Sequence, residues 1–262
     1  MKSDDWPYPF WIAHRGAGKR VPENTLAAFR EGAAQGFRMF ECDVKLSADD
    51  VPFLLHDSEL ERTTSGTGTA GARPWAALSQ LDAGRWHGPL HAGEPLPTLA
   101  AIARFVLANG LAINLEIKPT PGMETRTGQL VARVAAQLWT GSAPPPLLSS
   151  FEVPCLEAAA EAAPALPRAL LLDDLWSGWF ETARRLACVA VVTHHRLMDA
   201  TLAQRLHAAG MRALVYTVNT PADLAAMRAA GVDGVITDEV ERYGPDARPQ
   251  GSGLSCVSAG GA

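Results

Sequence analysis

Three acidic side chains in two short apolar segments have a spacing that suits a metal site. Glu41 and Asp43 lie two residues apart in one segment, and Glu116 lies in the next. Residues i and i+2 of a β-strand point to the same face, so Glu41 and Asp43 point together while Cys42 points away. Converging carboxylates repel one another unless a cation or a shared proton lies between them. The pattern therefore predicts a site for one divalent cation, Mg²⁺ or Ca²⁺, because both prefer oxygen ligands.

Two histidines and two cationic side chains occur at the ends of apolar segments as well. His14 and Arg15 follow the first segment, His56 ends the run that follows the acidic pair, and Lys118 lies two residues after Glu116. Histidines change charge near neutral pH and can act as general acid and general base. Arg15 and Lys118 can neutralise phosphate oxygens. A metal site, two proton-transfer groups and two cations are what the cleavage of a phosphodiester requires.

Each feature also has a structural explanation. The tripeptide that begins at His14 could have a structural role, an acidic pair on a strand could face solvent, and Lys118 could simply mark a strand end. Their occurrence together favours a functional site, because charges that interrupt apolar strands would be buried, and an unpaired buried charge is unfavourable. His195 follows the sixth apolar segment and could reach the same site.

Short apolar runs alternate with longer amphipathic segments, which is typical of a parallel sheet surrounded by helices. We predict a (β/α)8 barrel (TIM barrel), with the active site at the C-terminal ends of the strands. The predicted strands are 10–14, 38–44, 112–117, 147–150, 168–172, 189–193, 213–218 and 234–237. Helices are predicted between them, for example at 24–35, 99–109, 127–139, 200–209 and 222–230. Glycines 36, 110, 210 and 231 are expected to end four of these helices.

Three segments depart from this alternation. Residues 45–56 have the pattern of a hairpin, with polar turn residues before an apolar run. Residues 57–97 are rich in Gly, Thr, Pro and Trp and are too long for a bare loop, so we expect a small cap inserted after the second strand, over the barrel mouth. We expect residues 1–245 to form a single catalytic domain, and residues 246–262, rich in Gly, Ser and Pro, to be disordered.

The composition of the 262-residue sequence argues against several functional classes. The net charge is −5 and no basic run occurs, so we expect no nucleic-acid partner. No stretch approaches the roughly 18 apolar residues of a membrane helix, and the N-terminus does not resemble a secretory signal. The four cysteines are scattered and are expected to be reduced thiols in a cytoplasmic protein. The oligomeric state stays open.

The same residues belong to a longer series that resembles the glycerophosphodiester phosphodiesterase family, and in particular its cytosolic bacterial type associated with glycerol 3-phosphate uptake. The resemblance runs in order over about residues 10–245. It comprises Ile12-Ala13-His14-Arg15-Gly16, Pro22-Glu23-Asn24-Thr25, Glu41-Cys42-Asp43-Val44, His56-Asp57, Leu60, Arg62-Thr63, Glu116-Ile117-Lys118, Ser149-Ser150-Phe151, Tyr216-Thr217-Val218-Asn219, Gly231-Val232-Asp233-Gly234 and Thr237-Asp238.

The resemblance implies metal-dependent hydrolysis of glycerophosphodiesters, such as glycerophosphocholine and glycerophosphoethanolamine, to sn-glycerol 3-phosphate and an alcohol. It implies that His14 and His56 are the acid/base pair, that Glu41, Asp43 and Glu116 bind the divalent metal, and that Arg15 and Lys118 contact the phosphate. Tyr216, where many relatives have Trp, is expected to contact substrate. Glu23 and Phe151 are further candidates, whereas Asn24 or Thr25 is expected to cap the first helix.

Other functions stay open at this point. A phosphodiesterase of the same fold could act on lysophospholipids or sphingomyelin, although no amphipathic membrane-docking segment is evident. A non-catalytic barrel could bind glycerophosphodiesters, but binding alone needs no pair of proton-transfer groups. An aldolase or isomerase would more naturally have a Schiff-base lysine in an apolar pocket, whereas Lys118 lies two residues from Glu116.

Overall fold

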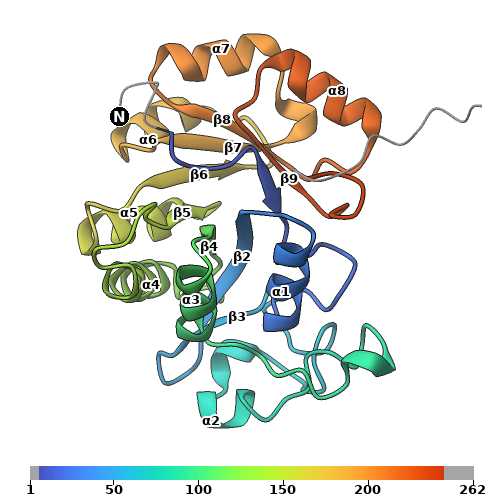
Figure 1. The fold of residues 1–262 in the computed structure, drawn as a ribbon. Coiled ribbons are helices and arrows are strands. Elements are labelled where there is room, and N and C mark those ends of the chain that lie inside the picture. Colours follow the sequence, from blue (N-terminus) through green and yellow to red (C-terminus); the bar gives the residue numbers. More distant parts are fainter. Residues whose placement is uncertain (1–5, 245–262) are drawn as a thin grey trace, which may run out of the picture.

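The computed structural model describes residues 6–244, and eight parallel strands form a closed barrel in it (Figure 1). The first strand pairs with both the second and the last, which closes the ring. The strands are β1 (Trp11–Ala13), β2 (Met39–Leu46), β4 (Ala112–Ile117), β5 (Leu147–Ser150), β6 (Arg168–Leu172), β7 (Ala190–His194), β8 (Arg212–Tyr216) and β9 (Gly234–Thr237). The predicted (β/α)8 barrel is confirmed, and the strand ends differ from the predictions by at most two residues.

Helices connect the barrel strands. They are α1 (Leu26–Ala34), α3 (Leu99–Ala108), α4 (Glu124–Leu138), α5 (Val153–Ala162), α6 (Trp179–Arg185), α7 (Ala200–Ala208) and α8 (Pro221–Ala230). Side chains of Thr25, Thr98, Asp199 and Thr220 accept hydrogen bonds from backbone N–H groups at four helix N-termini. The four glycines expected at helix ends all have positive φ, from 60° to 87°. The predicted start of α4, at residue 127, was three residues too late.

Strand β2 shows how alternation places the charged residues. Its even-numbered residues, Phe40, Cys42, Val44 and Leu46, belong to the core between barrel and helices, as expected for Cys42. Its odd-numbered residues, Met39, Glu41, Asp43 and Lys45, therefore share the interior face. The N-terminal end of the interior is apolar, filled by Ile12, Met39, Ala112, Leu147, Leu171, Val192, Leu214 and Ile236. Charged side chains thus gather toward the C-terminal ends of the strands.

The predicted hairpin and insert follow β2. Strand β3 (Pro52–Leu54) pairs antiparallel with β2, with Val44 opposite Leu54. The segment 57–97 contains η1 (Ala70–Ala72), α2 (Trp75–Leu78) and η2 (Pro89–His91). With β3 it packs around an apolar cluster of its own: Phe53, Leu55, Leu60, Ala70, Leu78, Ala83 and Leu96. In Figure 1 it lies beyond β3, on the opposite side of the view from α7 and α8.

Within residues 6–244, no helix combines the length and the apolar character needed to cross a lipid bilayer. Cys42, Cys155 and Cys188 are buried and free. The predicted domain, 1–245, and the predicted disordered tail, 246–262, extend outside the described residues, so both stay predictions.

Candidate active site

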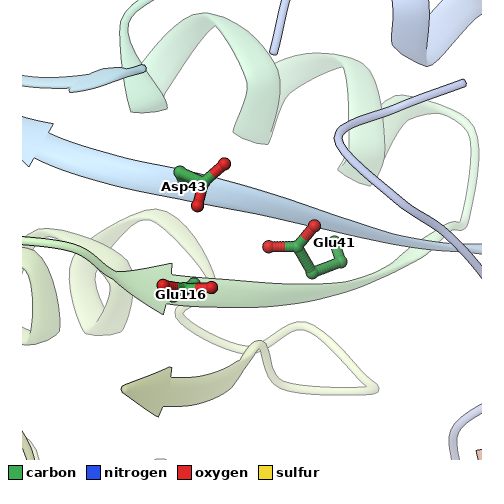
Figure 2. A group of neighbouring side chains, drawn as sticks. All are labelled: Glu41, Asp43 and Glu116. Atoms are coloured by element: carbon green, nitrogen blue, oxygen red, sulfur yellow. The ribbon is translucent and has the colours of Figure 1, made fainter. Parts of the chain in front are cut away.

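The three carboxylates predicted to bind metal converge inside the barrel. Asp43 on β2 lies opposite Glu116 on β4 in register, and both share the interior face with Glu41. One oxygen from each of the three residues lies within 4.8 Å of the others (Figure 2). Exposure is 3% for Glu41, 1% for Asp43 and 9% for Glu116. The barrel therefore holds three carboxylates close together and largely out of water.

Electrostatics at this cluster fit a bound cation. Burial and the charge of Asp43 raise the pKa of Glu41 to about 8. Burial and Asp43 also raise the pKa of Glu116, against the opposing charge of Lys118. Burial alone would raise the pKa of Asp43, but the charges of Arg15 and Lys118 lower it to about 2. Since Oε1 of Glu41 is buried without a hydrogen-bond partner, this carboxylate suits coordination of a hard divalent cation.

His14 contacts Asp238, the residue that follows β9. Its Nδ1 lies 2.6 Å from Oδ1 of Asp238, and its Nε2 lies 3.8 Å from Oε2 of Glu41. Asn219 donates a hydrogen bond of 2.8 Å to the other oxygen of Asp238. Burial would lower the pKa of His14, but the hydrogen bond with Asp238 and the charge of Glu41 raise it. The ring is therefore fixed with Nε2 facing the carboxylate cluster.

His56 forms a second histidine–aspartate pair at the same site. Its Nδ1 lies 2.6 Å from Oδ1 of Asp57. Arg62 in the insert donates hydrogen bonds to Asp57 (3.0 Å) and Glu23 (2.8 Å). The pKa of His56 is lowered, because burial and the charges of Arg15 and Lys118 outweigh the attraction of the neighbouring carboxylates.

The two predicted phosphate ligands flank the carboxylates. Nε of Arg15 lies 3.4 Å from Asp43, and Nζ of Lys118 lies 2.8 Å from Glu116. Asn24 has a role beyond the one predicted: its amide donates to Oδ2 of Asp43 at 2.8 Å, and its Oδ1 accepts the backbone N–H of Asp43 at 3.1 Å. Thr25, not Asn24, is the residue that caps α1.

Two connected hollows surround these groups. The inner cavity, about 210 Å³, is lined by His14, Arg15, Glu41, His56, Asn114, Glu116, Lys118, Phe151, Leu171, Tyr216, Thr217 and Ile236. The outer cleft, about 960 Å³, shares His56, Glu116, Lys118, Phe151 and Tyr216 with it and extends past Lys45, Asp57, Glu59, Glu124, Glu152, Asp173 and His194. Phe151 and Tyr216 meet edge to face with ring centroids 5.8 Å apart. A separate cavity of about 510 Å³, around Cys188 and Met211, contains none of the predicted site residues.

The structure brings together all the predicted site residues except one. His195 begins a short 3-10 helix, stacks on His194 at 4.5 Å and faces Asp223, with Nε2 3.7 Å from Oδ1. His194, not His195, lines the outer cleft, because His194 is the inward-facing last residue of β7.

Sequence reasoning assigned no role to five residues that the structure places around the site: Lys45, Asp57, Arg62, Asn219 and Asp238. Four of them occur in the motif series, all but Lys45, and that series was their only signal. Lys45 is inward-facing by the same alternation that identified Asp43, and its Nζ donates to the carbonyl oxygen of Lys118 at 3.1 Å.

The chain has relatives among known protein families and curated proteins. The sequence profile of the glycerophosphoryl diester phosphodiesterase family matches residues 14–242. Bacillus subtilis YhdW is 32% identical over 233 residues, which cover 87% of this chain and 93% of that protein. The glycerophosphodiester phosphodiesterase of Caldanaerobacter subterraneus subsp. tengcongensis is 31% identical, over 88% of this chain and 94% of that protein.

Among solved structures, a phosphodiesterase of Oleispira antarctica in complex with its product sn-glycerol 3-phosphate superimposes with a TM-score of 0.83. It is 35% identical, and the match covers 88% of this chain and 93% of that one. The closed barrel and its acidic cluster place the protein among the barrel enzymes with a candidate metal site. The chain belongs to the glycerophosphoryl diester phosphodiesterase family.

Proposed function

We propose that this glycerophosphodiester phosphodiesterase hydrolyses glycerophosphodiesters to sn-glycerol 3-phosphate and an alcohol, with a divalent cation at Glu41, Asp43 and Glu116. The observation that carries the proposal is the convergence of these buried carboxylates with two histidine–aspartate pairs in one cavity. A sensor or carrier would need the cations and the metal but not the paired histidines.

The negative charge of the phosphate would be stabilised by the divalent cation and by two cationic side chains. A bound divalent cation would polarise the phosphodiester and lower the pKa of the attacking hydroxyl. Arg15 and Lys118 would neutralise the charge of the phosphate oxygens. Because the side chains of Arg15 and Lys118 contact Asp43 and Glu116, they would also hold the phosphate close to the metal site. Neither Mg²⁺ nor Ca²⁺ is favoured by the ligand set, since both bind carboxylate oxygens.

We assign the two histidines opposite proton-transfer roles, with the glycerol as its own nucleophile. His14 borders the inner cavity alone, whereas His56 borders both hollows. With glycerol in the inner cavity and the alcohol in the outer cleft, His14 takes the proton of the 2-hydroxyl. The oxygen of the 2-hydroxyl then bonds to phosphorus, and the bond between phosphorus and the alcohol oxygen breaks. His56 protonates the departing alcohol oxygen. Water opens the cyclic phosphate with the two roles reversed.

Two charges would favour these protonation states. Oε2 of Glu41 lies 3.8 Å from Nε2 of His14. A cation held by Glu41 would offset the negative charge of this carboxylate and so favour the neutral form of His14. The negative phosphodiester would favour the protonated form of His56.

The proton-transfer roles can be tested with leaving groups. A p-nitrophenyl ester of glycerol 3-phosphate has a leaving group that needs no protonation. His56→Ala should therefore cleave this ester far better than glycerophosphocholine, while His14→Ala should cleave neither. Equal losses of both variants on both substrates would contradict the assignment. An analogue without the 2-hydroxyl that is cleaved at the normal rate would contradict the internal nucleophile.

The lining of the outer cleft favours substrates whose alcohol is cationic, such as choline or ethanolamine. Four carboxylates line it beyond the catalytic residues, and none takes part in a salt bridge among residues 6–244: Glu59, Glu124, Glu152 and Asp173. The aromatic faces of Phe151 and Tyr216 lie at the junction with the inner cavity. Carboxylates and aromatic faces both attract ammonium groups.

The overall activity is tested by incubating the protein with glycerophosphocholine and glycerophosphoethanolamine and measuring sn-glycerol 3-phosphate in a coupled assay. Product that EDTA abolishes supports the proposal. No product with either Mg²⁺ or Ca²⁺, together with cleavage of lysophosphatidylcholine or sphingomyelin, would replace it with a lipid-directed activity.

We further propose a cytoplasmic location and a small-molecule substrate as the partner. The three described cysteines are free, as is usual in a reducing compartment. Fractionation of the native cells tests the location.

A further inference from the structure

Asn114 is a buried polar residue without a partner. Its side chain is 0% exposed, lines the inner cavity, and has no hydrogen-bond partner for either Oδ1 or Nδ2 among the described residues. It lies on β4 two residues before Glu116, on the same interior face, and is opposite Glu41 in register. Buried amides almost always have hydrogen-bond partners, and one left without is unfavourable. Asn114 therefore offers an unpaired amide group at the wall of the inner cavity.

The proposed reaction leaves one polar group of the substrate without a protein contact. The three acidic residues serve the cation, Arg15 and Lys118 serve the phosphate, and His14 serves the 2-hydroxyl. Of the other residues that line the inner cavity, Leu171 and Ile236 are apolar. The terminal hydroxyl of glycerol, on the carbon farthest from the phosphate, still needs a partner.

An asparagine amide suits a hydroxyl group. A hydroxyl donates one hydrogen bond and accepts others, and the amide offers both an acceptor oxygen and two donor hydrogens. Thr217 also lines the cavity, but it is only partly buried, so it can reach water. Asn114 is more deeply buried than Thr217 and has no protein partner among the described residues, so it gains more from a hydrogen bond with a substrate hydroxyl.

We propose that Asn114 binds the terminal hydroxyl of the glycerol moiety and thereby restricts the enzyme to diesters in which this hydroxyl is free. The inference rests on the proposed function. It predicts rejection of lysophospholipids, because an acyl chain on this oxygen removes the hydroxyl donor and must fit a cavity of about 210 Å³.

The test compares glycerophosphocholine with 2-hydroxypropyl phosphocholine, which keeps the attacking hydroxyl and lacks only the terminal one. A site that binds a substrate hydroxyl through buried groups rejects analogues that lack it, and we expect kcat/KM to fall by at least about 100-fold. In Asn114→Leu the two substrates should differ by less than about 10-fold, because the unpaired amide is gone. Asn114→Ser serves as a second variant and should give an intermediate ratio.

Thr193→Val is the matched control. Thr193 is also fully buried and its hydroxyl also has no partner among the described residues, but it alternates with the inward-facing Val192 and does not line the cavity. This variant should keep the ratio of the unaltered protein.

A binding measurement separates failure of this inference from failure of the proposed function. Calorimetry in Mg²⁺ compares sn-glycerol 3-phosphate with 2-hydroxypropyl phosphate and needs no turnover. Preference for the glycerol compound that is lost in Asn114→Leu supports the inference even if glycerophosphocholine is not cleaved. Equal binding of both compounds by the unaltered protein overturns it. Equal losses on both substrates in Asn114→Leu would also overturn it, since Asn114 would then support only the metal site.

Discussion

The carboxylate of Asp238 lies 2.6 Å from the imidazole of His14, although 224 residues separate the two along the chain. The pairing of β1 with β9, which closes the barrel, brings them together: Ala13 is opposite Thr237, the residue before Asp238. Barrel closure therefore brings His14, the proposed catalytic histidine, next to its aspartate partner. A hydrogen bond at Nδ1 fixes the orientation of the ring and leaves Nε2 free for proton transfer.

We expect Asp238→Asn to lower kcat/KM by about 10- to 100-fold, because an oriented general base contributes about 10²–10⁴-fold to such reactions. Steady-state kinetics on glycerophosphocholine measures the loss. Asp223→Asn is the matched control, since Asp223 faces His195 outside the cleft at 3.7 Å and should change the rate less than about twofold. A full rate in Asp238→Asn would contradict the role of the pair.

Arg62 is expected to stabilise the fold only where its partners are ionised. Its hydrogen bond lowers the pKa of Asp57, and with Arg15 it lowers that of Glu23 against the effect of burial. Carboxylates with lowered pKa values contribute stability above their ordinary values, near 4, and lose it as the pH falls through the lowered ones.

Arg62→Gln should therefore lower the free energy of unfolding by roughly 1 kcal/mol at about pH 7, a small value because water screens these partly exposed pairs. The difference should shrink at about pH 3. Urea denaturation at both pH values measures it. A difference that grows at low pH would contradict the assignment of these ion pairs.

The charge of the outer cleft should select the alcohol. The double variant Glu152→Gln, Asp173→Asn should lower kcat/KM for glycerophosphocholine several-fold and leave the uncharged-headgroup substrate glycerophosphoglycerol nearly unchanged. Both residues are exposed, so added salt should weaken the preference in the unaltered protein. Equal effects on both substrates would show that these carboxylates do not discriminate between cationic and uncharged headgroups.

Close packing of α4 against α5 depends on a glycine. A methyl group on Gly128 would lie 2.2 Å from the carbonyl oxygen of Cys155. Gly128→Ala should therefore destabilise the protein by about 1–3 kcal/mol, the usual effect of overpacking. Gly88→Ala adds the same methyl group where nothing lies within 4 Å and is the control. Thermal melts of the two variants should differ by several degrees, and equal melting temperatures would contradict this packing.

Local patterns were enough to predict much of the fold and the carboxylate cluster. Two-residue alternation in β2 and β4 fixes which side chains share a face, and apolar runs separated by helical segments identify the barrel. The bounds of α5 and α6 were not predicted. Helix α5 contains alanine-rich sequence with little amphipathic contrast, and α6 has only seven residues.

Contacts between distant segments could not be predicted from local patterns. The side-chain pairs Asn219–Asp238 and Arg62–Glu23 depend on how the barrel closes and where the insert folds back. His195 illustrates the same limit: a one-residue difference decides whether a side chain faces the cleft, and β7 ends with His194 facing inward. Periodicity locates a strand end only to within a residue or two.

The central claim is that Glu41, Asp43 and Glu116 hold a catalytic divalent cation, and Glu41→Gln tests it most directly. Metal-free protein and variant are compared for melting temperature and for release of sn-glycerol 3-phosphate from glycerophosphocholine, before and after addition of Mg²⁺ or Ca²⁺. Because the variant removes one of three mutually repelling carboxylates, it should be at least as stable as the unaltered protein without metal. Metal should raise the melting temperature and restore turnover in the unaltered protein only. Full turnover in EDTA, or equal metal-induced stabilisation of the variant, would contradict the account.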